Sequence, residues 1–96
     1  PDATAELRGM TLANSDRAHV ARAAVEGLLG LMRHALDAVR SLGVPLDRVV
    51  LVGGGAKSAA VRALAPQMLD AAVELPEPGE YVALGAAKQA ARVLGA

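Results

Sequence analysis

Large aromatic side chains are almost missing from this sequence, whose 96 residues contain no Phe, no Trp and one Tyr. Ala, Val and Leu supply the apolar mass, so a core built from them relies on close backbone packing. Cysteine is absent as well, which excludes disulfides and thiolate metal sites and fits a reducing compartment. No apolar run approaches the roughly 20 residues of a membrane span, and no signal peptide opens the chain. We therefore expect a cytoplasmic protein that does not bind membranes.

Neither sign of charge is in excess, because ten Lys and Arg residues offset ten Asp and Glu residues. A neutral chain with mixed signs gives no electrostatic reason to bind nucleic acid. The length allows one small domain that buries roughly 60–65% of the surface of the unfolded chain. The first residue is Pro1 rather than Met, so we expect residues 1–96 to be part of a longer protein.

Helical and strand patterns alternate along the chain. Residues 1–14 show no period, whereas apolar residues in 15–42 recur at steps of three and four, which predicts a helix. Ser15 is its expected N-cap, and Gly43 followed by Pro45 ends it. The later predicted elements are a strand at 48–52 buried on both faces, a helix at 57–69 that Pro66 kinks or stops near Ala65, a strand at 71–75, and a helix at 81–94.

The order of these elements predicts an α/β fold. A strand–helix–strand unit of this length joins parallel neighbours through a right-handed crossover, so helices should cover both faces of the parallel strands. Two strands do not complete such a sheet, and the strand at 49–52 keeps an open edge. We therefore expect the chain to form a homo-oligomer; the alternative is that the helix at 15–42 folds over the open edge and caps it within one chain.

Three consecutive glycines, Gly53, Gly54 and Gly55, follow the first strand directly. Their position beyond the carboxyl end of a parallel strand, with outward-facing backbone amides, favours a site for phosphates or the polar edge of a nucleotide. The alternative is a strand-to-helix turn that needs glycine only for its dihedral angles. The dinucleotide fingerprint is excluded because Lys57 and Ser58 stand where its last glycine belongs. The P-loop is excluded because Ala56 precedes Lys57.

The other conspicuous polar residues favour structural roles. His19 is expected to have a surface or capping role, and Glu26 is expected to pair with Arg22. Lys57 either approaches a phosphate or is solvated. The acidic residues show no metal-ligand spacing, so the sequence predicts no metal ligand and no catalytic residue in this chain.

Three blocks of sequence, in this order, are similar to the C-terminal domain of the FGGY carbohydrate kinases. They are Ala5-x-Leu7-x-Gly9-Met10 with His19-Val20-x-x-Ala23-Ala24-Val25-Glu26, then Gly53-Gly54-Gly55-Ala56-Lys57-Ser58, and finally Ala83-Leu84-Gly85-Ala86-Ala87. The resemblance covers essentially the whole chain, 1–96, but only about the last fifth of a complete kinase. Within the family the fit is closest to the xylulokinases, although the ribulose, gluconate and glycerol kinases share these blocks.

The resemblance implies part of an actin-like, ribonuclease-H-like ATPase domain from a bacterial kinase that phosphorylates a sugar with ATP and Mg²⁺. Carried over by motif position, Gly54, Gly55 and Ala56 would lie against the adenosine and phosphate chain, with Gly53 and Ser58 shaping the turn. The catalytic base, the metal ligands and the sugar pocket lie upstream in the family.

A second hypothesis is a non-enzymatic α/β module, either a nucleotide sensor or an assembly domain. The coding sequence upstream of Pro1 separates the two hypotheses, since a sugar-kinase N-terminal domain there would identify the enzyme.

Overall fold

The computed structural model describes residues 1–95 and contains three α-helices, two β-strands and one 3₁₀ turn. In chain order they are α1 (Arg17–Arg40), β1 (Arg48–Val50), η1 (Gly54–Lys57), α2 (Ala59–Leu69), β2 (Ala72–Glu74) and α3 (Tyr81–Val93). The predicted order of helices and strands is confirmed. Both strands are shorter than predicted, because only three residues in each have a partner in the ladder.

The N-cap of the long helix α1 lies one residue later than predicted, at Asp16 instead of Ser15. Asp16 has extended backbone (φ −73°, ψ 169°), and its side chain accepts a hydrogen bond from the His19 N–H at 2.8 Å. The prediction of Ser15 as the cap was therefore wrong, because the residue directly before the first helical turn supplies the acceptor. At the other end, Gly43 turns the chain away with φ +81°, a conformation that favours glycine.

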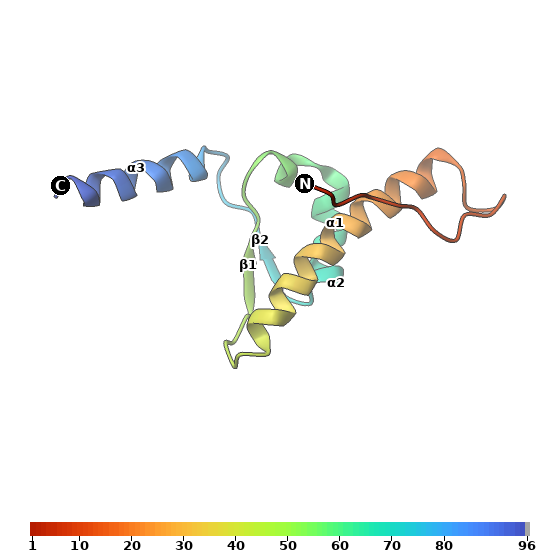
Figure 1. Ribbon diagram of the computed structural model, residues 1–96, viewed down its shortest axis with the longest axis horizontal. Coiled ribbons are helices and arrows are strands. Elements are labelled where there is room, and N and C mark those ends of the chain that lie inside the picture. The colour runs from red at the N-terminus through yellow and green to blue at the C-terminus, as the bar shows by residue number, and fades with distance from the viewer. Residues whose placement is uncertain (96) are drawn as a thin grey trace.

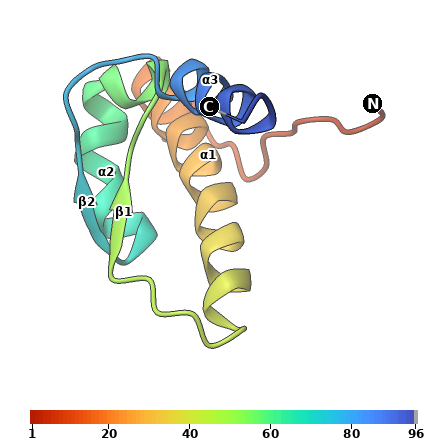
Figure 2. The same ribbon diagram turned by 90° about the vertical axis from the view of Figure 1, so that its left-hand side faces the viewer.

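The two strands pair in parallel, as predicted, and α2 forms the crossover between them (Figure 2). Arg48 lies opposite Ala72, and Val50 lies opposite Glu74. Because the strands are parallel, both of their carboxyl ends lie at one edge of the sheet, and the two loops that follow them lie at that edge too.

The core lies between α1, α2 and one face of the sheet. Leu29 of α1 and Leu69 of α2 are fully buried there, and Val49, Leu51 and Val73 face them from the strands. The opposite face of the sheet is exposed and carries an ion pair between Arg48 and Glu74 at 3.5 Å. Within residues 1–95 the first strand is thus covered on one face, and the prediction that it is buried on both was wrong for this chain.

Helix α2 continues through Pro66 to Leu69, so the early stop expected near Ala65 does not occur. The proline cannot donate to the carbonyl one turn earlier, which weakens the helix at that point. Leu64, Ala65 and Leu69 are all buried against the core, and burying them stabilises the last turn. Packing therefore outweighs the local preference of the sequence.

Helix α3 extends away from the rest of the molecule (Figure 1). Among the described residues it lies close to no other helix or strand, and none of its side chains is buried. Its largest apolar side chains are consequently exposed: Val82, Leu84 and Val93. The helices that the structure describes include none with the length and apolar character needed to cross a membrane.

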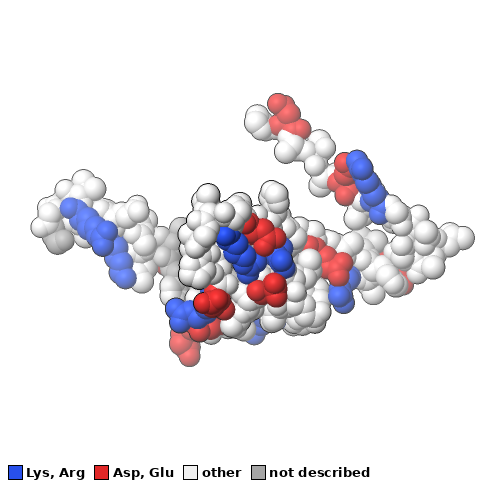
Figure 3. Space-filling model, turned by 90° about the horizontal axis from the view of Figure 1, so that it is seen from below, with Lys and Arg blue, Asp and Glu red and all other residues white. Residues whose placement is uncertain are grey.

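Charged side chains of both signs are interspersed on the face of the molecule seen from below (Figure 3). An ion-pair network lies on α1, where Asp37 contacts Arg33 and Arg40, at 2.8 Å and 2.9 Å. The two arginines also donate to backbone carbonyls at the end of α2, including that of Met68. The network therefore joins the two helices as well as neutralising charge.

Candidate functional site

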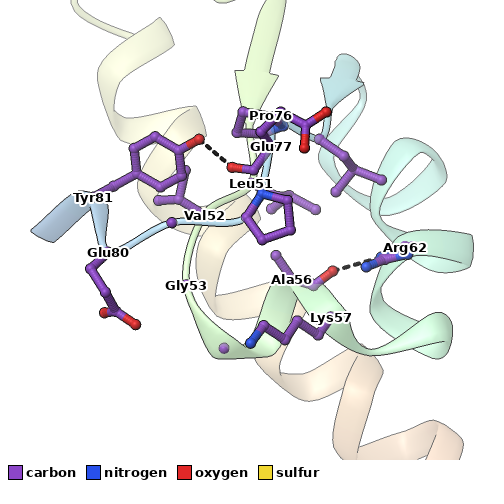
Figure 4. Close-up of a pocket in the computed structure, with 14 residues that line it drawn as sticks. Leu51, Val52, Gly53, Ala56, Lys57, Arg62, Pro76, Glu77, Glu80 and Tyr81 are labelled. Carbon is purple, nitrogen blue, oxygen red and sulfur yellow. Dashed lines mark hydrogen bonds between the residues drawn. The ribbon is translucent and has the colours of Figure 1, made fainter.

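A cavity of about 150 Å³ lies beyond the carboxyl ends of both strands (Figure 4). One wall is formed by the glycine loop, residues 53–58, of which Gly53, Gly54, Ala56 and Lys57 line the cavity, whereas the predicted binding residues Gly55 and Ser58 do not. The other wall is the proline loop, residues 75–80, which continues into Tyr81. A parallel sheet places both loops at the same edge, which is where ligands bind in open α/β sheets. A cavity therefore lies at the edge of the sheet where the sequence predicts the site.

Gly53 is required by the backbone. Its dihedral angles are φ +93° and ψ 179°, a combination that side chains with a Cβ avoid. This conformation turns the chain from the strand into η1. The turn hypothesis from the sequence therefore accounts for Gly53.

Gly54 and Gly55 are not required by the backbone in the same way. Neither has a positive φ, and a Cβ atom added at either position would meet nothing within 4 Å. Among the hydrogen bonds within residues 1–95, none has the N–H of Gly54 or Gly55 as its donor. A dihedral requirement alone thus leaves these two glycines unexplained.

The remaining residues of the glycine loop attach it to the protein. Ala56 is half-buried and packs against the core. Ser58 caps α2 by accepting a hydrogen bond from the Val61 N–H at 3.4 Å. The Lys57 side chain lines the cavity and lies alongside the loop (Figure 4). All five predicted binding residues are therefore in one loop, with Ala56 and Ser58 serving mainly to hold it.

Two other side chains at the cavity were not predicted from the sequence. Arg62 of α2 donates from Nε to the Ala56 carbonyl oxygen at 2.7 Å. On the opposite wall, the Tyr81 hydroxyl donates to the Glu77 carbonyl oxygen (Figure 4). The parallel pairing of the strands was the available signal for Tyr81, since it places the end of the second strand beside the glycines. The Leu84-to-Ala87 cluster, by contrast, does not line this cavity.

The cavity combines two basic residues, Lys57 and Arg62, with two acidic ones, Glu77 and Glu80. In the part of the chain that the structure describes, no three His, Cys, Asp or Glu residues come together to hold a metal ion. The cavity is also smaller than the roughly 300–1,000 Å³ of most small-molecule sites. It can therefore contact part of a nucleotide through backbone and side-chain groups.

The polar residues near the start of α1 have structural partners. His19 contacts the cap residue Asp16 through Nδ1 at 2.8 Å as well as through its backbone N–H. Hydrogen bonds from the His19 backbone and ring hold the pKa of the Asp16 carboxyl below its usual value. Glu26 pairs with Arg22 at 2.8 Å, on an exposed helix surface. The capping and ion-pair interpretations of His19 and Glu26 are confirmed.

Comparison with known proteins shows a match over nearly the whole chain. Residues 1–94 match the C-terminal domain of the FGGY family of carbohydrate kinases. The chain is 32% identical to the xylulose kinase of Haemophilus influenzae, over 94% of the chain and 18% of that protein. It is 42% identical to the xylulose kinase of Streptomyces coelicolor, over 74% of the chain and 14% of that protein. It is also 33% identical to the L-fuculokinase of Escherichia coli, over 83% of the chain and 17% of that protein.

The same likeness is found among solved structures. The crystal structure of xylulose kinase from Bifidobacterium adolescentis superposes with a TM-score of 0.75 and 56% sequence identity, over 99% of this chain and 19% of that one. The chain therefore spans less than a fifth of the length of the relatives that it matches. At this identity the fold is shared, and the helices and parallel strands described above are part of an actin-like ATPase domain.

Proposed function

The chain belongs to the FGGY family of carbohydrate kinases, matching its C-terminal domain, and we propose that it is the last portion, residues 1–96, of an ATP-dependent xylulokinase. The reaction is transfer of the terminal phosphoryl group of ATP to D-xylulose, which gives D-xylulose 5-phosphate and ADP. The observation that carries the proposal is 56% identity to a solved xylulose kinase over 99% of the chain. Two xylulose kinases among the curated relatives support it.

In this proposal the glycine loop binds the adenosine side of ATP. Gly54 and Gly55 leave room for the nucleotide to approach the backbone, and Ala56 forms part of the same surface, while Gly53 and Ser58 fix the turn. The small volume of the cavity fits a site that further residues of the upstream chain complete. Catalysis then depends on positioning and charge stabilisation that this portion shares with the rest of the enzyme.

Magnesium, when bound, supplies neutralisation of the phosphate charge during transfer. Residues 1–95 bring no set of metal ligands together, so we place those ligands upstream, with the catalytic base and the sugar pocket. We further propose that the enzyme is cytoplasmic, binds neither nucleic acid nor membranes, and is a homo-oligomer.

A second candidate is a kinase of the same family that acts on another sugar or polyol. The 33% identity to an L-fuculokinase over 83% of the chain favours this candidate over a non-enzymatic nucleotide-sensing or assembly module. In this proposal the groups that select the sugar lie outside the chain. The glycine loop therefore does not distinguish a xylulokinase from a kinase of the same family that acts on another sugar.

The test is a substrate panel on the full-length protein. ADP release is measured with MgATP and, in turn, D-xylulose, ribulose, L-fuculose, gluconate and glycerol. We expect the highest kcat/KM with D-xylulose. A higher kcat/KM with another sugar would replace the proposed substrate, and no sugar-dependent ADP release from folded protein would favour the non-enzymatic module.

A further inference from the structure

The glycine loop has little structure of its own to hold it in shape. It contains a single 3₁₀ turn, η1, whose first two residues are Gly54 and Gly55. Each glycine loses more backbone entropy on ordering than any other residue would. Two backbone hydrogen bonds close the turn, from Ala56 N to Gly53 O at 3.2 Å and from Ser58 N to Gly55 O at 3.1 Å. Short turns of this type are only marginally stable by themselves.

Arg62 supplies an additional attachment from outside the loop. Its Nε donates to the Ala56 carbonyl oxygen at 2.7 Å, which joins the middle of η1 to the second turn of α2. The donor carries a positive charge, and such hydrogen bonds are shorter and stronger than neutral ones. Helix α2 is itself fixed in the core through Val61 and Leu64, which are both buried. Arg62 therefore ties the middle of the loop to a rigid element, in addition to the packing of Ala56 and the cap at Ser58 (Figure 4).

We propose that Arg62 is a positioning residue of the nucleotide site. Its Nε–H bond to the Ala56 carbonyl holds the glycine loop in the shape that places Gly54 on the cavity wall and leaves open space around both Gly54 and Gly55. The loop is then ordered before the nucleotide arrives, so that binding does not have to supply the free energy of ordering it. This inference rests on the proposed function, because it assumes that the loop contacts ATP.

Three variants separate this role from the alternatives. In Arg62→Gln, the side-chain amide nitrogen stands the same number of bonds from the backbone as Arg Nε, so the donor is kept and the charge is removed. In Arg62→Met, a methyl group takes that place, so both donor and charge are lost. In Arg62→Lys, the charge is kept on a more flexible side chain that lacks the Nε position.

In the full-length kinase we expect Arg62→Met to raise KM for ATP by about three- to tenfold, the loss that corresponds to one hydrogen bond. KM for the sugar and kcat should change by less than about twofold. Arg62→Gln should restore most of the ATP affinity. If Arg62 instead contacted a phosphate by charge, Arg62→Gln would be as defective as Arg62→Met and Arg62→Lys would retain affinity, which would overturn the proposal.

Amide hydrogen exchange of residues 53–58 gives a readout that does not depend on activity. We expect exchange in this loop to be faster in Arg62→Met than in the wild type and in Arg62→Gln, with the rest of α2 unchanged. Equal exchange in all variants would overturn the proposal even if the protein is an active kinase. An inactive wild type would contradict the proposed function, while the exchange experiment would still decide whether Arg62 orders the loop. Should Arg62→Met fail to fold, wild-type exchange in a folded Arg62→Lys, which lacks the Nε donor, would overturn the proposal.

Discussion

Arg40 Nη2 lies 3.0 Å from the Leu69 carbonyl oxygen, so a side chain of α1 closes the C-terminal end of α2. The same nitrogen donates to the Asp70 carbonyl at 3.1 Å, and Nη1 contacts Asp37 at 2.9 Å. The last carbonyls of a helix have no partner within the helix, and a cation placed there also complements the helix dipole. Asp70, with φ +51°, leaves α2 in the left-handed conformation directly at this point.

Replacing Arg40 with Met should lower the free energy of unfolding by about 1–3 kcal/mol, because carbonyls that are partly buried lose their partners. Arg22→Met is the matched control, since Arg22 pairs only with Glu26 on an exposed surface. Its expected cost is about 0.3–0.5 kcal/mol. Urea denaturation of both variants checks the difference. Equal losses would show that Arg40 contributes no more than a surface ion pair.

Stability should decrease in acid through Asp37. Hydrogen bonds from Arg40 and then Arg33 hold the pKa of the Asp37 carboxyl below its ordinary value of 3.8. A lowered pKa in the folded state means that the carboxylate stabilises the fold above about pH 4 and that this contribution is lost as the pH falls further. The melting temperature of Asp37→Asn should therefore fall less steeply than that of the wild type as the pH is lowered below about 5.

Asp16 titrates in the same range, because its pKa is also lowered, by His19. The melting temperature of Asp37→Asn should accordingly still fall somewhat in acid. It should fall less in the double variant that also carries Asp16→Asn. A melting curve for Asp37→Asn that runs parallel to the wild type at every pH would contradict this assignment.

Two substitutions in the glycine loop should have different effects in the full-length enzyme, one on ATP binding and the other on stability. Gly55→Val should raise KM for ATP much more than KM for the sugar, because the branched side chain fills the space through which the nucleotide approaches. Gly53→Ala should instead lower stability by about 1–3 kcal/mol, since alanine resists its backbone conformation. Steady-state kinetics and thermal melting test the pair. Unchanged ATP kinetics in folded Gly55→Val would favour the simple turn.

The isolated chain should associate with itself. Within residues 1–95, β1 pairs only with β2, and α1 packs against α2 rather than over the open edge of β1. Val50 is 44% exposed near that edge. Water satisfies the free backbone groups of such an edge but not its apolar side chains.

Sedimentation at micromolar concentration measures this association, which we expect to proceed through edge pairing or exchange of α1. Val50→Lys should then reduce the association, whereas Val82→Lys on α3 should not. A monomeric wild-type chain would contradict the prediction. Equal effects of the two lysines would assign the association to general apolar exposure rather than to the strand edge.

The isolated chain should also have no kinase activity. Phosphoryl transfer needs a base, bound magnesium and an oriented acceptor, and the described residues supply no complete set. The purified chain is mixed with MgATP and the sugar panel, and ADP release is compared with buffer. Turnover well above the buffer rate, in protein free of contaminating kinase, would show that the chain holds more of the catalytic machinery than we infer.

Sequence patterns predicted the order of elements and the glycine loop at the end of β1 because both depend on short-range signals. The spacing of apolar residues identified α1, and three glycines after an apolar run identified the loop at the end of β1. The cap was displaced to Asp16 because Ser15 and Asp16 are both suitable acceptors, and only the backbone geometry chooses between them.

Errors arose where distant parts of the chain determine the outcome. Val49 to Val52 form an apolar run typical of a strand covered on both faces, yet the cover on one face is absent within residues 1–95. Pro66 stayed inside α2 because the residues around it are buried against α1. Arg62 and Tyr81 were missed because their roles depend on carbonyls of the loops, which no side-chain motif reveals.

Tyr81 belongs both to the wall of the cavity and to the first turn of α3. Its hydroxyl donates a hydrogen bond to the Glu77 carbonyl four residues earlier, which joins the ring to the proline loop. Helix α3 is about 20 Å long and is attached to the rest of the molecule through this loop alone. A partner that packed against the exposed apolar side chains of α3 would therefore bind next to Tyr81, on the wall of the cavity opposite the glycine loop.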